Sequence, residues 1–215
     1  MGEIWRWARD HPDDIWAATV QHAEIVLLAS ALSVAVWVPV GVLLRGRRIP
    51  FATAMGAAGV MYTVPSLALF AMLVPVLGIG REPVILGLVL YSPLLLVRNT
   101  VVGLQGVPRH VVEAARGMGL TPRQVLLRVE LPLALPSIMA AVRVVVVTTV
   151  GIATIGVLVG AEGIGTLIYT DGLNRLFLPP VAVGAALATA MALLLDALLL
   201  GAERILAPWA QAAAA

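Results

Sequence analysis

The polar stretch Glu113–Pro132 is the part of this sequence whose residue types could do chemistry with another molecule. It places Arg and Glu side chains between two long apolar segments, so the chemistry would be binding through charge and hydrogen bonds. The chain has no Cys, no H-E-x-x-H motif and only three scattered His residues, and no Ser has a plausible His base. The sequence therefore predicts neither a metal site nor a catalytic residue.

A short helix is predicted at the start of this stretch, over residues 108–118. Gly119 follows it, where helices commonly end in a left-handed residue that glycine adopts without strain. The apolar side chains of this helix recur at helical spacing, and they are Val111, Val112, Ala115 and Met118.

A second short helix is predicted directly after Gly119. Thr121 has the side chain of an N-cap, Pro122 occupies the first helical position, and Gln124 falls at the capping-box position. We expect this helix to cover residues 122–129 and to end before Pro132. Two short helices held at both ends by apolar segments would form a stiff knob, and a solvated connection between helices is the alternative.

The composition places the segments around this stretch in a membrane. Of the 215 residues, 60% are hydrophobic and 12% are charged, and the mean hydropathy is +1.00. The apolar blocks have about the 20 residues that a helix needs to cross roughly 30 Å of hydrocarbon. The net charge of +2 comes with no basic cluster, so nucleic-acid binding is not expected. We predict an all-α integral membrane protein with one transmembrane domain over residues 1–215.

About five transmembrane helices are predicted. Pro65 and Pro75 interrupt the second, where we expect a kink, because neighbouring helices can satisfy the freed carbonyl groups. Residues 3–16 form either an amphipathic segment at the membrane interface or a frayed terminus. A Gly-rich connection over residues 160–177 precedes the last span. The predicted spans are residues 22–44, 51–77, 83–103, 137–160 and 179–200, with a loop over residues 105–136.

Three ionisable side chains fall inside these predicted spans. Glu24 lies near the start of the first span, Arg98 near the end of the third and Asp196 near the end of the fifth. Charges at membrane depth usually face a cavity or a partner. Each of the three is also close enough to a helix end to reach the headgroups, so both a helix-end role and a pore or interhelical pair are open.

The distribution of arginine predicts the orientation of the chain. All 14 basic residues are Arg, and with the loop 105–136 in the cytoplasm ten lie inside and four outside. This bias satisfies the positive-inside rule, and it places the N-terminus outside and the C-terminus inside. The inner residues are Arg45, Arg47, Arg48, Arg98, Arg109, Arg116, Arg123, Arg128, Arg143 and Arg204, and the outer ones are Arg6, Arg9, Arg81 and Arg175.

The polar stretch also resembles a known motif. Glu113-Ala114-Ala115, three residues, Gly119, nine residues and Val129-Glu130-Leu131-Pro132 are similar to the EAA motif of permeases in binding-protein-dependent ABC importers. The one departure is Val129, where the motif has Ile. The resemblance implies a type I ABC importer permease fold in which the loop 105–136 is a cytoplasmic coupling loop. It assigns ATPase coupling to Glu113, Ala114, Ala115, Gly119, Val129, Leu131 and Pro132.

Further segments narrow the resemblance to permeases for osmoprotectants such as glycine betaine, choline, carnitine and proline betaine. Glu162 departs from the pattern, because a small residue is expected there. The resemblance implies a pore subunit, not itself an enzyme, in a bacterial cytoplasmic (inner) membrane. The segments that carry it are Thr63–Leu69, Gly78–Gly80, Tyr91–Thr100 and Gly160–Ile168.

The partners follow from the same resemblance. The chain has no G-x-x-x-x-G-K-[ST] loop, so no cofactor is expected on it, and ATP and Mg would bind another polypeptide. The resemblance implies ATP-binding cassette subunits, an extracytoplasmic substrate-binding protein, and a second permease that is a copy or a paralogue. ATP-driven closure would switch the permease between inward-facing and outward-facing forms. Glu113 would pair with a basic residue of the ATPase.

The substrate path is predicted from aromatic residues, because aromatic faces bind quaternary ammonium groups. The candidates are Tyr62, Tyr91 and Tyr169, with Pro65 and Ser66 beside the predicted kink. The alternative is that these aromatic side chains only pack, since the binding protein sets most of the selectivity in such transporters.

The alternatives to an osmoprotectant importer are an ABC importer for another solute and a transporter that does not use ATP. A different ABC importer substrate, such as a methionine-like amino acid or ergothioneine, is compatible with the same permease sequence. An ion-coupled secondary transporter or channel would need carboxylates near the bilayer centre or inverted repeats. The sequence shows Pro breaks but no internal symmetry.

Overall fold

The computed structural model describes residues 2–209, and this part of the chain consists of helices and short connections without a strand. The predicted all-α fold is therefore confirmed. In chain order the α-helices are α1 (Gly2–Asp10), α2 (Pro12–Leu44), α3 (Arg48–Thr63), α4 (Ser66–Leu77), α5 (Arg81–Tyr91), α6 (Pro93–Gln105), α7 (Arg109–Gly117), α8 (Pro122–Val125), α9 (Leu131–Ala153) and α10 (Leu178–Leu206). Four short π- or 3₁₀-helical turns are η1 (Leu126–Glu130), η2 (Thr154–Val159), η3 (Thr166–Gly172) and η4 (Leu173–Arg175).

Four helical segments in the described residues are long and apolar enough to cross a membrane, and α3 with α4 makes a fifth if that bent pair is one span. This agrees with the prediction of about five spans. The four segments are Pro12–Leu44, Arg81–Gln105, Pro122–Val159 and Leu178–Leu206.

The first of these segments begins earlier than predicted. α2 starts at Pro12, not near residue 22, because a proline fits the first turn of a helix and Asp13 and Asp14 there complement its dipole. The preceding residues form a separate helix, α1, so the alternative of a frayed terminus is wrong. The side chains of Trp5 and Trp16 are exposed.

The second predicted span is broken at Pro65, where the sequence predicted only a kink. α3 and α4 meet at an angle of 97°. Val64 has extended dihedral angles because the ring of the following proline disfavours helical ones. Pro75 lies inside α4 and does not end it.

The helix that begins at Pro122 does not end before Pro132, so that prediction is wrong. It passes through η1 into α9 and continues as one segment to Val159. In η1 the N–H of Leu131 donates to the carbonyl of Leu126, five residues back. This wider turn lets the helix continue past a residue that has no N–H to donate.

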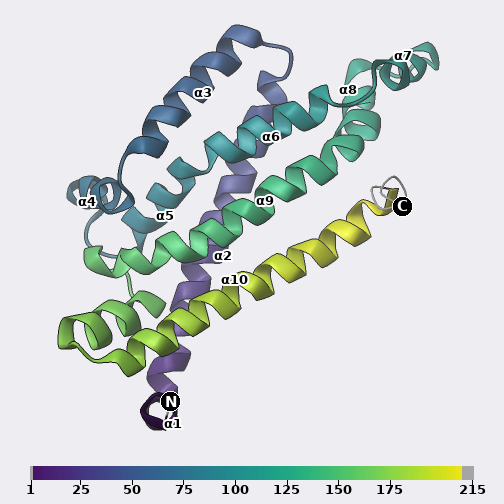
Figure 1. Cartoon of the computed structure of the whole chain (residues 1–215). Helices are drawn as coiled ribbons and strands as arrows, with labels where there is room; N and C mark the ends of the chain where they lie inside the picture. The colour runs from purple at the N-terminus through teal and green to yellow at the C-terminus, as the bar shows by residue number, and fades with distance from the viewer. Residues whose placement is uncertain (1, 210–215) are drawn as a thin grey trace.

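The core lies where α2, α6 and α9 pack against one another, with α5 against α2. Its central side chains, Val26, Phe70, Val84, Leu96 and Val150, are fully buried. α10 lies along α9 at the outside of this group and keeps most of its surface exposed (Figure 1).

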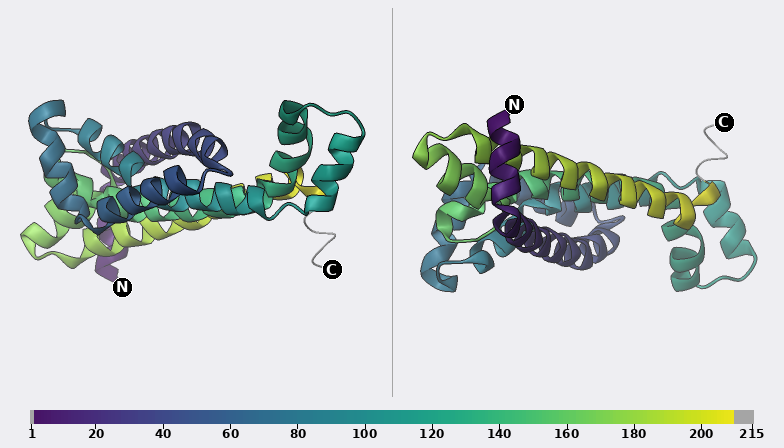
Figure 2. Two further views of the ribbon diagram at one scale, coloured as in Figure 1. Left: turned by 90° about the horizontal axis from the view of Figure 1, so that it is seen from above. Right: turned by 90° about the horizontal axis from the view of Figure 1, so that it is seen from below.

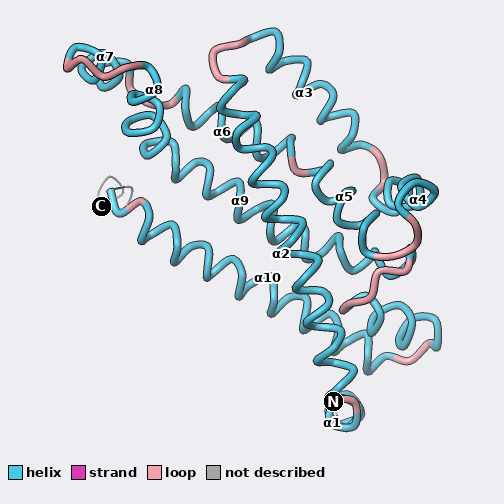
Figure 3. The backbone as a smooth tube through the Cα atoms, turned by 180° about the vertical axis from the view of Figure 1, so that it is seen from behind, coloured by secondary structure: helices cyan, strands magenta, loops and turns pink. Residues whose placement is uncertain are grey.

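The molecule is elongated, with different elements at its two ends (Figure 2). One end carries α7, α8 and the end of α10, and the other carries α1, α4 and η3. The Gly-rich connection lies at the second end, and Figure 3 shows it as helix apart from short loops. Gly163 packs so closely on α2 that an added Cβ would lie 3.1 Å from His22 Nδ1.

Candidate functional site

The knob, defined as α7, α8 and the turn between them, is closed by local hydrogen bonds. At the end of α7 the N–H of Leu120 donates to Ala115 O at 3.3 Å and the N–H of Gly119 donates to Arg116 O at 2.9 Å. Gly119 has a φ of +85°, so the predicted left-handed residue is confirmed. This pair of bonds is the Schellman arrangement, which satisfies the last carbonyl groups of a helix.

The start of α8 has the predicted capping box. The N–H of Thr121 donates to Gln124 Oε1 at 2.8 Å, and the N–H of Gln124 donates to Thr121 Oγ1 at 3.4 Å. Such a cap typically stabilises a helix by about 1 kcal/mol. The knob is therefore held in one shape by its own sequence.

The residues predicted to couple to an ATPase divide into two groups. Glu113, Ala114 and Gly119 are exposed on the knob, while Ala115 is only 2% exposed, on the helix that packs against α8 and η1. The second group is partly buried in η1 and the first turn of α9, and it consists of Val129, Leu131 and Pro132. The first part of the motif, around Glu113, is thus exposed on the knob, and the last part, from Val129 to Pro132, belongs to η1 and α9.

One contact of this region was missed by the sequence analysis. Arg45 Nη2, directly after α2, lies 3.3 Å from Glu130 Oε2 in η1, and both side chains are largely buried. Glu130 stands between Val129 and Leu131, where the motif accepts any residue, so the spacing gave no signal. This ion pair joins the base of the knob to the end of α2.

The structure brings together two of the three tyrosines predicted to line a substrate path. The rings of Tyr62 and Tyr91 are 5.9 Å apart and perpendicular, and the Tyr91 hydroxyl donates to Val64 O at the break between α3 and α4. Tyr62 is 46% exposed but Tyr91 only 8%. Pro65 is exposed and Ser66 is partly buried.

The cavity beside these two rings is small. Its volume is about 20 Å³, which is room for about one water molecule and not for a quaternary ammonium group. Tyr169 lies on η3 and is not among the residues that line this cavity. The lining residues are Tyr62, Leu88, Tyr91, Ser92, Leu95, Val145, Thr148, Thr149 and Ile152.

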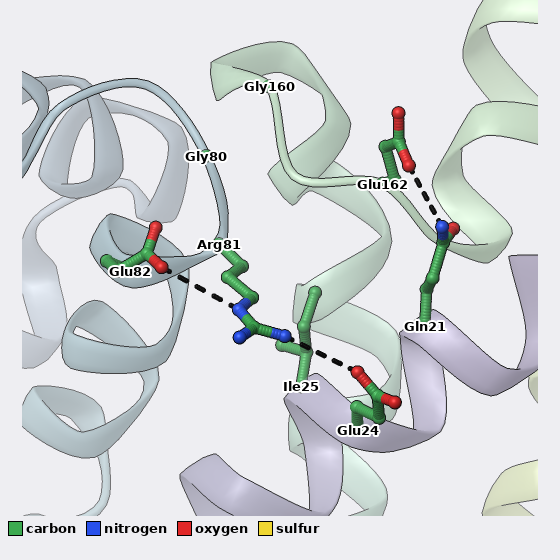
Figure 4. A pocket seen from close by; sticks show the side chains of 8 residues that line it. All are labelled: Gln21, Glu24, Ile25, Gly80, Arg81, Glu82, Gly160 and Glu162. Carbon is green, nitrogen blue, oxygen red and sulfur yellow. Dashed lines mark hydrogen bonds and ion pairs between the residues drawn. The ribbon is translucent and has the colours of Figure 1, made fainter.

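The end of the molecule opposite the knob has a larger, polar cavity of about 310 Å³ (Figure 4). Glu24 Oε2 lies 3.4 Å from Arg81 Nη1, so Glu24 makes an interhelical pair with the start of α5. Glu162, where a small residue was expected, accepts a hydrogen bond of 2.9 Å from Gln21 Nε2. The Glu24–Arg81 ion pair is well exposed, so it contributes at most about 1 kcal/mol to stability.

The other two ionisable residues in the predicted spans differ from each other. Arg98 is exposed on α6. Asp196 accepts two hydrogen bonds from Arg143, so it makes an interhelical pair. Arg143 lies within α9, inside the predicted span over residues 137–160. No group of His, Asp and Glu within residues 2–209 could hold a metal ion.

A buried histidine was also missed. His22 in α2 is 1% exposed, and its Nε2 donates to Val150 O at 3.1 Å. Where α9 passes into the 3₁₀ turn η2, the N–H of Thr154 donates to the carbonyl groups of Gly151 and Ile152 instead of that of Val150. The Val150 carbonyl is therefore available to the imidazole. His22 therefore ties α2 to the end of α9.

Comparison with known proteins agrees with this arrangement. Residues 31–210 match the family described as "Binding-protein-dependent transport system inner membrane component". The choline transport system permease protein OpuBB of Bacillus subtilis (strain 168) is 37% identical over 209 residues, which cover 97% of this chain and 95% of that one. The osmoprotectant import permease protein OsmW of Salmonella typhimurium (strain LT2) is 35% identical, and the match covers 93% of this chain and 94% of OsmW.

Solved structures share the fold. Inward-facing structures of the MetNI methionine ABC transporter include a chain with a TM-score of 0.75 and 24% identity, and the match covers 89% of this chain and 94% of that one. An amino acid ABC transporter has a chain with a TM-score of 0.73 and 18% identity, with 91% and 95% covered. The expected permease fold and the resemblance to osmoprotectant permeases are both confirmed. This chain belongs to the family of inner membrane components of binding-protein-dependent transport systems.

Proposed function

We propose that this chain is the permease subunit of an ATP-driven importer for a small osmoprotectant of the glycine betaine, choline, carnitine or proline betaine type. The observation that carries the proposal is the similarity, over more than nine tenths of the chain, to permeases named for choline, carnitine and osmoprotectant transport. The similarity to a methionine transporter is lower and concerns the fold. An osmoprotectant is therefore the preferred substrate over a methionine-like amino acid or ergothioneine.

The knob is the surface that couples this chain to ATP hydrolysis on a partner subunit. Its exposed part includes Glu113, which supplies a carboxylate for a basic residue of the partner, and Ala114, whose small side chain allows close approach. Two capped helices that pack on η1 move as one body, so a push on the knob reaches α9 without being absorbed by a loop. ATP and Mg bind to the partner.

The arginine bias supports an orientation with the knob in the cytoplasm. Figure 2 shows the knob and the end of α10 at one end of the molecule and α1 at the other, so this orientation puts the N-terminus outside. The polar cavity with Glu24, Arg81 and Glu162 then opens toward the substrate-binding protein. A second permease, identical or paralogous, completes the pore.

Reconstitution tests this proposal. The complete transporter in proteoliposomes, with its ATPase and its binding protein, should hydrolyse ATP faster when glycine betaine, carnitine or choline is supplied outside, and it should accumulate that solute. Methionine serves as the matched competitor. Stimulation by methionine alone would redirect the substrate assignment, and uptake that follows an ion gradient without ATP would contradict the importer itself.

A further inference from the structure

A cluster of three charged side chains lies between α9 and α10. Arg143 in α9 donates through Nε to Asp196 Oδ1 at 2.8 Å and through Nη2 to Asp196 Oδ2 at 2.9 Å. Glu203 adds a second carboxylate, with Oε2 at 3.8 Å from Arg143 Nη1. The three side chains are 27%, 34% and 20% exposed, so all of them are partly accessible.

This cluster borders a groove of about 500 Å³ on the exposed side of α9 and α10. The groove is apolar except for Arg143, Asp196 and Thr148. Its volume is many times that of the cavity beside Tyr62 and Tyr91, and it is large enough for a small solute. The lining residues are Ala140, Arg143, Val144, Val147, Thr148, Ala192, Leu193 and Asp196.

The pair lies deep along both helices. Arg143 is about 18 Å from Leu131 along α9, and Asp196 is about 15 Å from the end of α10 at Leu206, at 1.5 Å per residue. Both helices belong to segments that are long and apolar enough to span the membrane. A depth of this size corresponds to about half of a 30 Å hydrocarbon layer.

Charged side chains at such a depth face the interior of a bundle or a water-filled cavity, because lipid cannot solvate them. The groove is open on one side, and the pair reaches its surface. We therefore expect water, and not hydrocarbon, against this part of α9 and α10. In an importer, the aqueous cavity at membrane depth is the path of the solute.

The charges of the cluster match a zwitterion. The guanidinium of Arg143 lies between two carboxylates, those of Asp196 and Glu203. Glu203 Oε2 is buried and makes no hydrogen bond with any residue of the described chain. A planar guanidinium binds carboxylates through two parallel bonds, as Arg143 does with Asp196. A carboxylate on the solute could replace Asp196 at the guanidinium and free Asp196 for a cationic group.

We propose that this groove is a solute subsite on the translocation path, in which Arg143 binds the carboxylate of a zwitterionic solute and Asp196 faces its quaternary ammonium group. The inference rests on the proposed function for the class of solute. On this proposal the solute passes along the groove and not through the cavity beside Tyr62 and Tyr91. The Arg143–Asp196 pair then contributes to the choice of solute.

Thiol labelling tests whether the groove is aqueous. The chain has no Cys, so Val144→Cys and Val147→Cys introduce single thiols into the groove, at residues that do not line the tyrosine cavity. Leu194→Cys is the matched control, because Leu194 is exposed at the same depth of α10 and points away from the groove residues Ala192 and Asp196 by helical spacing. The probe is a membrane-impermeant thiosulfonate that carries a trimethylammonium group, applied to the complete transporter in vesicles.

The two groove variants should react at least about tenfold faster than the Leu194→Cys control, and glycine betaine should slow their reaction. Labelling with and without ATP covers both the inward-facing and the outward-facing form. Equal rates at all three positions, or no reaction at Val144→Cys and Val147→Cys in either form, would overturn the proposal. This readout does not require that the transporter accumulate any particular solute.

Solute selectivity tests the role of the charges. The double variant Arg143→Gln/Asp196→Asn removes both charges of the pair and keeps two side chains that can hydrogen-bond to each other, while Glu203, near the end of α10, keeps its charge. We expect its KM for glycine betaine, which has a carboxylate, to rise about tenfold, and its KM for choline, which has none, to rise less than about threefold.

Equal losses for the two solutes in the double variant would indicate a merely structural pair and would overturn the assignment. If the unmodified transporter moves neither solute, the proposed substrate fails, while the labelling pattern still decides whether the groove is aqueous. The two failures are therefore distinguishable.

Discussion

The knob and the break between α3 and α4 both turn the chain sharply, but they are held by different kinds of contact. The knob is closed by hydrogen bonds between residues at most five positions apart, around Gly119 and Thr121. The break at Pro65 is held by Tyr91, which is far away in sequence and donates its hydroxyl to Val64 O. The knob thus carries its shape in its own residues, whereas the break depends on the packing of another helix.

This difference suits two different tasks. A surface that transmits force to a partner needs a shape that survives when neighbouring helices move. A bend that depends on a neighbouring helix can change when that helix moves. Four substitutions test the comparison, and they are ordered from the largest expected effect to the smallest.

Reversing the charge of Glu113 should have the largest effect. Glu113 is exposed on the knob, so Glu113→Lys should leave folding and membrane insertion intact, but it would place a cation against the basic residue that we propose for the ATPase. We expect solute-stimulated ATP hydrolysis to fall at least about 100-fold. ATP hydrolysis in reconstituted vesicles measures this, with Glu113→Gln as the milder control. Unchanged stimulated activity in Glu113→Lys would remove the knob from the coupling mechanism.

Replacing Gly119 should weaken the coupling to ATP hydrolysis because it strains the backbone of the turn, without a collision of the new side chain. An added Cβ at Gly119 would meet nothing within 4 Å, but its φ of +85° disfavours any branched residue. Gly119→Val therefore strains the turn by about 1–2 kcal/mol, and we expect stimulated ATP hydrolysis to fall about 5–30-fold. Gly117→Ala is the matched control, since Gly117 is helical and its Cβ site is also open. Similar losses in both variants would contradict the role of the left-handed turn.

Removing the Tyr91 hydroxyl should affect the break and not the knob. Tyr91→Phe leaves the Val64 carbonyl without its donor, and we expect unfolding of the purified permease to become easier by about 1 kcal/mol. Thermal unfolding in detergent measures the change.

Tyr62→Ala, which removes the exposed ring of the pair, should leave transport kinetics unaltered. A changed KM in this variant would restore the tyrosines to the substrate path.

Removing the cap of α8 should have the smallest effect. Thr121→Ala deletes one side-chain bond of the capping box and should weaken the local helix by about 0.5–1 kcal/mol. Hydrogen exchange of the amides in α8 should become about 2–5-fold faster, with no change in α3 or α4. Faster exchange at the break as well would mean that the two turns are not independent.

The same distinction explains what the sequence could predict. Gly119 and Thr121 act on residues within a few positions, so their spacing was sufficient to predict both turns of the knob. The number and approximate places of the spans followed from apolar length. Pro132 misled, because a proline usually ends a helix, whereas here the π-helical turn η1 precedes it and the helix continues into α9.

Contacts between residues that are far apart in the chain could not be predicted from the sequence. Arg143 and Asp196 are 53 positions apart, and neither spacing nor composition indicates that they meet across two helices. The predicted path residues Tyr62 and Tyr91 do meet, but the space beside them holds about one water molecule. The outward placement of Glu113 agrees with the coupling role expected from the motif, which stays a prediction until hydrolysis is measured.

The continuous helix from Pro122 to Val159 also has a mechanical consequence. Because the wider turn at Leu126–Glu130 carries the helix past Pro132, one helical segment of 38 residues joins the knob to η2 at the other end of the molecule. A movement of the knob is therefore passed along one backbone toward the far end of this segment, where His22 binds the Val150 carbonyl. If the knob meets the ATPase, as we propose, this segment connects that contact mechanically with the opposite end of the molecule.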